Sequence, residues 1–483
     1  MEKNIKKNIL ISLFWAFFGQ GGYLIVGLIA NIILTRLLSP YEFGQVGIVM
    51  FFIVLAKVLT ESGLSGAVIR KTEVNEDDYS TVFVFNLVVS IILMVILISL
   101  SKTISMIYND ETLQYIIVAA SSILFINAFQ ITQNIKLIRN FNFKKKAIYE
   151  FISISISSLI GIFLALKNFG VWSIVVMQIS TAIILTSILW FKEGALKSVK
   201  FNKNSFKGLY KFGLNTTLAS LLNTFFDNIY QLILGKYFSI TETGLYFQGK
   251  KLQEIPIGVV NSVSQSVIFS SLSKFQNNIN EFNIFYNKII RVFTVLVGFM
   301  CLIIFFYAEN IIVTLYGIEW INSAFYMKVL IICSYFYLQE MFNRVVFKVF
   351  NKTNKILYLE VIKKIIQSVS IVIGLFFNDI SILLYGYILT SILSFLFNYY
   401  EARKLKQDFS NVEILIVFKV VLICAFTYFL SDYFLTKFTF INIYSIILLP
   451  FMFIAYFGFI YIMNILNIKY ELSNIISLIK KSH

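Results

Sequence analysis

Residues 34–44 of the chain read LTRLLSPYEFG, and residues 234–244 read LGKYFSITETG. Four of the eleven positions are identical at a constant offset of 200 residues, and the basic residue Arg36 aligns with the basic residue Lys236. The identities are Leu34/Leu234, Ser39/Ser239, Glu42/Glu242 and Gly44/Gly244. In each copy a Ser precedes a Glu by three positions, which is the capping-box spacing that starts a helix. Capping boxes are common, so accidental similarity is the alternative to an internal repeat.

Each copy is expected to be a tight turn between two helices. In the first copy Pro40 occupies the first helical position, which favours this residue. Arg36 and Lys236 would then lie at the C-terminal end of the helix before the turn, where the helix dipole stabilises a cation.

The composition is that of a membrane protein. Of 483 residues, 58% are hydrophobic, 17% aromatic and only 14% charged, which is too apolar for an ordinary soluble domain. Fourteen apolar stretches, each about long enough to cross 30 Å of hydrocarbon as a helix, are separated by short polar breaks. They cover approximately residues 10–34, 41–64, 79–101, 113–134, 148–166, 170–191, 208–235, 242–270, 284–308, 320–347, 357–377, 380–400, 413–431 and 441–466. We therefore expect an all-α integral membrane protein.

The distribution of Lys and Arg predicts the orientation, because basic loops stay on the cytoplasmic side. With the N-terminus inside, only five of the 41 basic residues fall in outer loops, namely Arg36, Lys102, Lys167, Lys236 and Lys437. The net charge of +16 is thus mainly a topology signal, and its scatter over many inner segments argues against nucleic-acid binding. Both termini are predicted to be cytoplasmic.

Six spans separate the two copies of the turn, and an even number makes both copies enter the membrane in the same direction. We predict two parallel six-helix lobes, residues 1–200 (spans 1–6) and 201–405 (spans 7–12). Residues 406–483 would add spans 13 and 14 and a basic cytoplasmic tail. Internal repeats of this kind are typical of secondary transporters, which bind substrate between their halves.

Charged residues inside predicted spans are candidates for function, since each costs at least a few kcal/mol to insert. Lys57 and Glu61 are four residues apart in span 2, and Lys250 and Glu254 repeat this arrangement in span 8. The two pairs, with Lys251, are predicted to line a substrate or ion pathway, and Pro256 would kink span 8 as a hinge. The alternative is that each pair only neutralises itself.

Asp227 in span 7 has no basic residue four positions away, and an unpaired buried carboxylate is a candidate proton-coupling group. A structural hydrogen bond to a neighbouring helix is the alternative. Basic residues near the cytoplasmic side of the second lobe could hold a phosphate, and Glu340/Arg344 and Glu360/Lys364 are spaced as helix-face pairs. The phosphate candidates are Arg291, Arg344, Lys348, Lys363 and Lys364. Otherwise these residues would only set the topology or extend towards the interface.

No catalytic residue, metal site or cofactor is predicted. Cys301, Cys333 and Cys424 fall in predicted spans at no metal-binding spacing, and the only histidine is His483. The segment 244–251 has the Gly-x4-Gly-Lys skeleton of a phosphate loop, but it lacks the Ser or Thr that binds Mg²⁺. ATP is therefore not expected to be the energy source.

Three segments resemble those of a known family: ILTRLLSPYEFGQVG (33–47), NFKKKAIYEFISISISSLIGIFLALKNFGVWSIVVMQ (142–178) and DNIYQLILGKYFSITETGLYFQGKKLQEIP (227–256). They are similar to the polysaccharide transporter family, the Wzx-type flippases of O-antigen, capsular and teichuronic-type polysaccharides. This family shares a superfamily with lipid II flippases and with multidrug and toxic compound extrusion pumps. The resemblance covers roughly the first 275 residues, and the rest of the chain agrees in hydropathy.

The resemblance implies a fourteen-helix transporter in the bacterial cytoplasmic membrane. It would move an undecaprenyl-pyrophosphate-linked oligosaccharide from the inner to the outer leaflet by alternating access, for cell-surface polysaccharide synthesis. A coupling ion, proton or sodium, is the expected energy source, and a polysaccharide polymerase and glycosyltransferases are the expected partners. The alternatives are an ion-coupled drug or small-molecule antiporter of the same superfamily and, less favoured, a membrane-embedded polymerase or acyltransferase.

Overall fold

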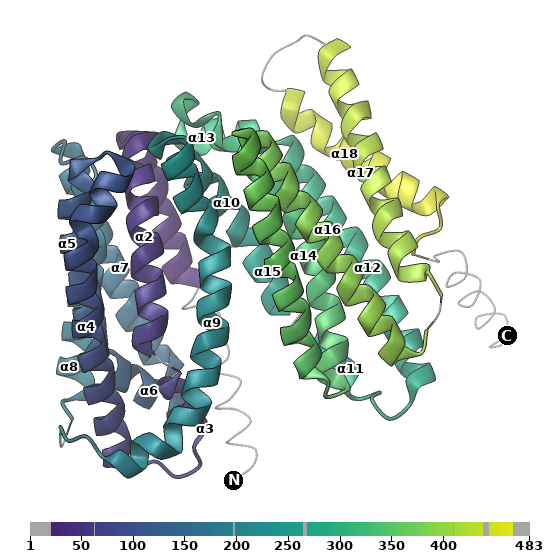
Figure 1. The fold of residues 1–483 in the computed structure, drawn as a ribbon. Helices are drawn as coiled ribbons and strands as arrows, with labels where there is room; N and C mark the ends of the chain where they lie inside the picture. The colour runs from purple at the N-terminus through teal and green to yellow at the C-terminus, as the bar shows by residue number, and fades with distance from the viewer. Residues whose placement is uncertain are drawn as a thin grey trace. The chain divides into compact units, whose positions relative to one another are not determined.

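The computed structural model describes residues 21–61, 63–196, 199–263, 268–408, 410–437 and 444–466, and within these ranges every regular element is a helix. The contacts divide the chain into two compact units. One comprises Met1–Gln248 with Val313–Trp320, and the other comprises Gly249–Ile312 with Ile321–His483. Each unit is a bundle of long helices that run side by side (Figure 1).

The first unit is built around α2, which packs against α5 and α9, while α4 packs on α5 and α7 packs on α8. Its helices are Gly21–Leu37, α2 (Pro40–Glu61), α3 (Leu64–Arg70), α4 (Glu76–Tyr108), α5 (Glu111–Ala128), α6 (Ile131–Arg139), α7 (Phe143–Leu166), α8 (Trp172–Glu193) and α9 (Lys203–Tyr237). The N-terminal part of α10 (Ile240–Val263), the end of α13 (Ala308–Tyr316) and the 3-10 helix η2 (Ile318–Trp320) complete this unit.

The second unit contains the remainder of α10 and the helices that follow it. These are α11 (Phe269–Ser273), α12 (Ile279–Phe306), α14 (Ser323–Val349), α15 (Thr353–Phe377), α16 (Ile380–Lys406), α17 (Val412–Lys437) and α18 (Tyr444–Ile462). Helix α16 packs on both α14 and α15, whereas α17 packs on α12 and on α18. A core of buried apolar side chains from α12, α14, α16, α17 and α18 joins the last two helices to the bundle.

In the described part of the chain, eight helices have the length and apolar composition of membrane spans, namely α2, α4, α5, α7, α8, α12, α16 and α17. Helices α9, α10, α14 and α15 carry more polar or charged residues but are long enough to span, since even the 24 residues of α10 extend about 36 Å at 1.5 Å per residue. Each predicted span overlaps one of the described helices. The expectation of an all-α, multi-pass membrane protein is confirmed.

The first repeated turn has both hydrogen bonds of the predicted capping box, whereas the second has the one accepted by its Ser, because the Ser239 N–H donates to the carbonyl oxygen of Leu234 at 3.0 Å. In the first copy the backbone N–H of Ser39 donates to Glu42 Oε2 at 2.7 Å, and Ser39 Oγ accepts from the Glu42 N–H at 3.4 Å. In the second copy Ser239 Oγ accepts from the Glu242 N–H at 3.0 Å. The caps satisfy N–H groups that have no partner within the helix, and so they fix where α2 and α10 begin.

The two copies also touch each other, at their glycines. A Cβ on Gly44 would lie 1.8 Å from the carbonyl oxygen of Ile240, and a Cβ on Gly244 would lie 1.8 Å from that of Pro40. Position 40 is equivalent to 240 and position 44 to 244, so the contact is reciprocal, as expected for two equivalent helices around a local two-fold axis. Only glycine allows helix backbones to approach this closely.

The basic residue of each turn binds the end of a different helix. Arg36 Nε donates to the carbonyl oxygen of Leu315 at 2.9 Å, and its Nη2 donates to that of Thr314, both at the end of α13. Lys236 Nζ donates to the carbonyl oxygen of Ile107 at 2.8 Å, at the end of α4. Both cations lie at the C-terminal end of their own helix, as predicted, and the hydrogen bonds given above go to the ends of other helices.

The division of the chain into lobes at residue 200 stays a prediction. The contacts of the described residues separate the chain at Gln248, within α10, and place α9 with the N-terminal helices.

Candidate functional site

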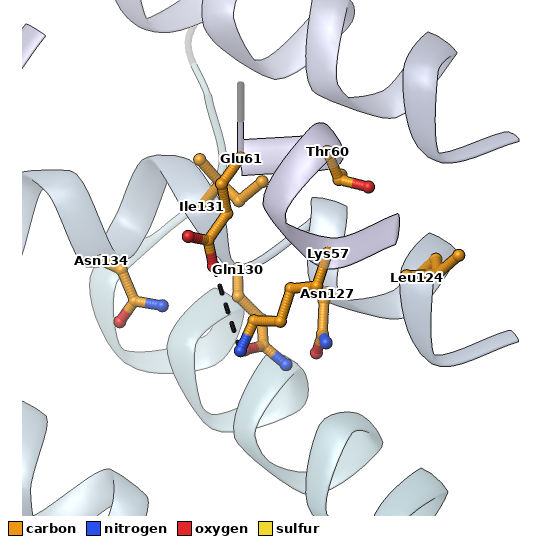
Figure 2. A pocket seen from close by; sticks show the side chains of 8 residues that line it. All are labelled: Lys57, Thr60, Glu61, Leu124, Asn127, Gln130, Ile131 and Asn134. Atoms are coloured by element: carbon orange, nitrogen blue, oxygen red, sulfur yellow. Dashed lines mark ion pairs between the residues drawn. The ribbon is translucent and has the colours of Figure 1, made fainter. Parts of the chain in front are cut away.

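A polar pocket of about 80 Å³ opens beside the C-terminal half of α2 (Figure 2). Lys57 and Glu61 form one wall, and their Nζ and Oε1 atoms are 3.9 Å apart. Both side chains are about half exposed, at 54% and 55%. The sequence-predicted pair is thus present as an ion pair whose tips face open space and not a packed helix.

The facing wall carries three amides. Asn127 lies at the end of α5, Gln130 lies in the break before α6, and Asn134 lies in the first turns of α6. Gln130 Nε2 donates to the carbonyl oxygen of Ala182 at 3.0 Å and to Thr186 Oγ1 at 2.9 Å, so contacts to α8 fix its orientation. Sequence reasoning missed these amides, although their spacing of three and then four residues places them on one helical face.

Thr60, Leu124 and Ile131 complete the lining of the pocket. Thr60 Oγ1 donates its hydrogen to the carbonyl oxygen of Ala56 at 2.9 Å, so towards a ligand in the pocket Thr60 can act only as a hydrogen-bond acceptor. The lining therefore combines one cation, one anion and several neutral hydrogen-bonding groups, with zero net charge.

The equivalent pair in α10 is also formed. Lys250 Nζ lies 3.6 Å from Glu254 Oε1, with exposed fractions of 14% and 60%. Pro256 lies inside α10, which continues to Val263. Proline removes one backbone hydrogen bond from the helix, which weakens α10 at this point. That α10 bends at Pro256 during transport stays a prediction. Lys251 follows Lys250 and is half-buried.

Three of the predicted phosphate-binding cations belong to a network inside the second unit. Arg344 Nη2 donates to Glu340 and to Glu360, while Lys363 Nζ lies 3.0 Å from Glu340 Oε2. Lys364 Nζ lies 3.3 Å from Glu360 Oε1. Both predicted helix-face pairs are present, and Arg344 connects them across α14 and α15. The network contains three cations and two carboxylates.

This network is buried, and each of its charged groups forms an ion pair with another member. The Glu340 side chain has no exposed surface and also accepts a hydrogen bond from Ser394 Oγ of α16 at 2.8 Å. A phosphate would have to compete with these carboxylates for Arg344 and the two lysines. Their role in phosphate binding stays a prediction, and their contacts link α14, α15 and α16.

The remaining candidates are Lys348, Arg291 and Asp227, and each has an interaction in the structure. Lys348 is exposed at the end of α14, and Arg291 Nη1 donates to the carbonyl oxygen of Ile465 at 2.7 Å, just after α18. Asp227 is exposed on α9 and has an interaction partner in the structure. The premise of an unpaired, buried carboxylate is therefore wrong, and proton coupling through Asp227 stays a prediction without that support.

Sequence reasoning also missed a second buried ion pair. Lys406 Nζ, at the end of α16, lies 2.8 Å from Glu413 Oε2 at the start of α17, and the two side chains are only 3% and 2% exposed. Lys406 Nζ also lies 3.8 Å from the ring centroid of Tyr286, whose hydroxyl is 3.1 Å from Glu413. The opposite charges of Lys406 and Glu413, at the two ends of a short loop, could have predicted this ion pair from the sequence. The pair anchors α17 to α12 and α16.

The fold is that of an all-α, multi-pass membrane protein. The structure is similar to that of the lipid II flippase MurJ in an inward closed conformation, with a TM-score of 0.74 and 18% identity over 94% of this chain and 99% of that chain. An inward-facing MATE family multidrug resistance transporter matches with a TM-score of 0.57 and 15% identity over 80% and 96% of the two chains.

The chain belongs to the polysaccharide biosynthesis protein family, whose sequence profile matches residues 33–325. The succinoglycan biosynthesis transport protein ExoT of Rhizobium meliloti is 21% identical over 65% of this chain and 64% of its own length. The teichuronic acid biosynthesis protein TuaB of Bacillus subtilis is 20% identical over 68% of each chain. The lipopolysaccharide biosynthesis protein WzxC of Escherichia coli is 20% identical over 61% and 60%. The matches thus span about two thirds of these relatives.

Proposed function

We propose that the protein translocates a lipid-linked oligosaccharide from the inner to the outer leaflet of the bacterial cytoplasmic membrane, for the synthesis of a cell-surface polysaccharide. The family, and relatives named for succinoglycan transport, lipopolysaccharide synthesis and teichuronic acid synthesis, support this function. The shared fold with a lipid II flippase agrees with it, because lipid II is itself a glycan on a lipid carrier.

The observation that carries the proposal is the pocket at Lys57 and Glu61. An ion pair in a membrane-spanning helix is costly, and this one is not buried in a helix contact but faces open space lined with amides. A glycan head group has to cross the hydrocarbon region in contact with polar groups, and such a pocket supplies them.

The proposed mechanism is alternating access coupled to an ion, proton or sodium, or to the membrane potential, and the protein is proposed not to be an enzyme. The proposed topology has both termini in the cytoplasm and the turns at Arg36 and Lys236 on the outer side. A glycosyltransferase would supply the lipid-linked substrate, and a polymerase would consume the translocated product.

An ion-coupled antiporter of small molecules is the second candidate. The observation in its favour is the similarity of the fold to a multidrug resistance transporter at a TM-score of 0.57. It predicts that loss of the gene sensitises cells to hydrophobic cations and leaves surface polysaccharide unchanged.

Deletion of the gene tests the two candidates together. We expect the deletion to abolish the surface polysaccharide and to cause lipid-linked oligosaccharide to accumulate on the cytoplasmic leaflet, where an external glycosidase cannot reach it. Accumulation on the outer leaflet would instead indicate a polymerase. Normal polysaccharide together with drug sensitivity would support the antiporter and refute the flippase.

A further inference from the structure

The chemistry of the pocket beside α2 is unsuited to a phosphate. The Lys57 ammonium is 3.9 Å from the Glu61 carboxylate, so the charged lining is neutral overall. A pyrophosphate would bring further negative charge close to Glu61, and like charges at such distances repel each other. Anion sites instead collect an excess of cations or of backbone N–H groups.

The same lining suits a neutral ligand that is rich in hydroxyl groups. Each sugar hydroxyl donates one hydrogen bond and accepts others, and each amide side chain offers both donors and an acceptor. Lys57 adds a donor, and Glu61 adds an acceptor. The pocket thus presents both kinds of group from two walls (Figure 2).

Two of the amides are available for a ligand. The side chains of Asn127 and Asn134 are partly exposed and make no hydrogen bond to other residues in the described ranges of the chain. Gln130, by contrast, has both Nε2 hydrogens directed at Ala182 and Thr186, which leaves its Oε1 as an acceptor of fixed direction. One preset acceptor flanked by two adaptable amides can discriminate between hydroxyl arrangements.

The size of the pocket sets a limit on what enters. A volume of about 80 Å³ holds roughly six water-sized groups. This is enough for the hydroxyl-bearing edge of one sugar residue and too little for an oligosaccharide.

We propose that this pocket binds one neutral sugar residue of the lipid-linked oligosaccharide through Asn127, Asn134 and the Lys57–Glu61 pair, and that it does not bind the pyrophosphate. The inference rests on the proposed function and deepens it. It assigns α2 and the α5–α6 break to recognition of the glycan.

Binding to the purified full-length protein in lipid nanodiscs tests this assignment. The probes are the repeat-unit oligosaccharide released from the surface polysaccharide of the producing strain, and inorganic pyrophosphate. Asn127→Ala and Asn134→Ala should each weaken oligosaccharide binding by about 3- to 10-fold, because each removes neutral hydrogen bonds to the ligand. Neither change should alter the affinity for pyrophosphate. Gln114→Ala, on the same helix α5 but outside the pocket, is the matched control and should change neither affinity.

Lys57→Gln separates the sugar assignment from a phosphate assignment. It removes the one cation of the pocket lining and leaves Glu61, so a phosphate pocket would bind pyrophosphate more weakly in this variant. We expect the pyrophosphate affinity to stay within twofold of that of the unmodified protein. A fall of tenfold or more would overturn the proposal, as would unchanged oligosaccharide binding by the Asn127→Ala/Asn134→Ala double variant or the absence of oligosaccharide binding by the unmodified protein.

Complementation distinguishes failure of this inference from failure of the proposed function. If the deletion strain makes normal polysaccharide, the function itself is wrong. If the deletion abolishes polysaccharide and the double variant, at normal protein level, restores it at the full rate, the flippase function stands and the glycan pocket is refuted.

Discussion

Alanine at Gly44 or Gly244 should force apart the crossing of α2 and α10. The new Cβ would lie 1.8 Å from a carbonyl oxygen of the facing helix, and Cβ contacts shorter than 3.0 Å essentially do not occur. The two backbones must therefore separate by at least about 1.2 Å. Overpacking of this kind costs about 1–3 kcal/mol. Because the contact is reciprocal, both substitutions should cost about the same.

Two measurements check this expectation. The apparent Tm in nanodiscs should fall by a few degrees. The side chain of Thr243 has no exposed surface, so a Thr243→Cys reporter in the crossing should react slowly with a membrane-impermeant maleimide. If the crossing opens and closes on one equilibrium, 1–3 kcal/mol raises the reactive population roughly 5- to 150-fold.

Gly258→Ala is the matched control on the same helix. A Cβ at Gly258 meets nothing within 4 Å, so alanine there should be neutral or should stabilise the helix by about 0.5–1 kcal/mol. If Gly244→Ala gives the same Tm and the same labelling rate as Gly258→Ala, the reasoning about the glycine crossing is refuted.

Three further substitutions follow from the observed ion pairs. Glu340→Ala leaves buried cations without their carboxylate and should lower the stability by about 3–5 kcal/mol, as seen in a strongly reduced Tm. Glu413→Ala breaks the ion pair with Lys406 and leaves that buried cation without its carboxylate, so it should lower the stability by a similar amount. Limited proteolysis between α16 and α17 should then increase. Arg36→Gln removes a cation from the end of α13 and should cost only about 0.3–1 kcal/mol, less at high salt.

Each of these expectations has its own contrary result. Wild-type melting of the Glu340→Ala protein would show that the network is not needed for packing of α14 and α15. Unchanged proteolysis of the Glu413→Ala protein would show that apolar contacts alone hold α17. A loss of several kcal/mol in Arg36→Gln would show that this turn does more than cap a helix.

The sequence was sufficient for the fold class because hydropathy and helix capping are local along the chain. A run of about 20 apolar residues must form a helix in a bilayer, since no water satisfies its backbone there. The Ser-x-x-Glu spacing at 39–42 and 239–242 likewise located the starts of α2 and α10, because both groups of the cap lie within one turn.

Only those parts of the candidate site that lie on one helix could be predicted from the sequence. The Lys57–Glu61 and Glu340–Arg344 pairs could be read from a spacing of four residues, because both members share one helix. The amides opposite Lys57 could not be assigned to the same pocket, since they lie on other helices. Asp227 was misread because burial cannot be read from the local sequence: its side chain is exposed and has an interaction partner.

The sequence by itself determined the all-α membrane class, where α2 and α10 begin, and which charges share a helical face. Only the tertiary structure decided that Gly44 meets Ile240, that Arg344 is committed to two carboxylates, and that Asn127 and Asn134 face an ion pair. The physical reason is distance along the chain. The hydropathy of a span and the cap of a helix are each set by one continuous segment of the chain. Side-chain packing, in contrast, joins residues that lie far apart in the sequence.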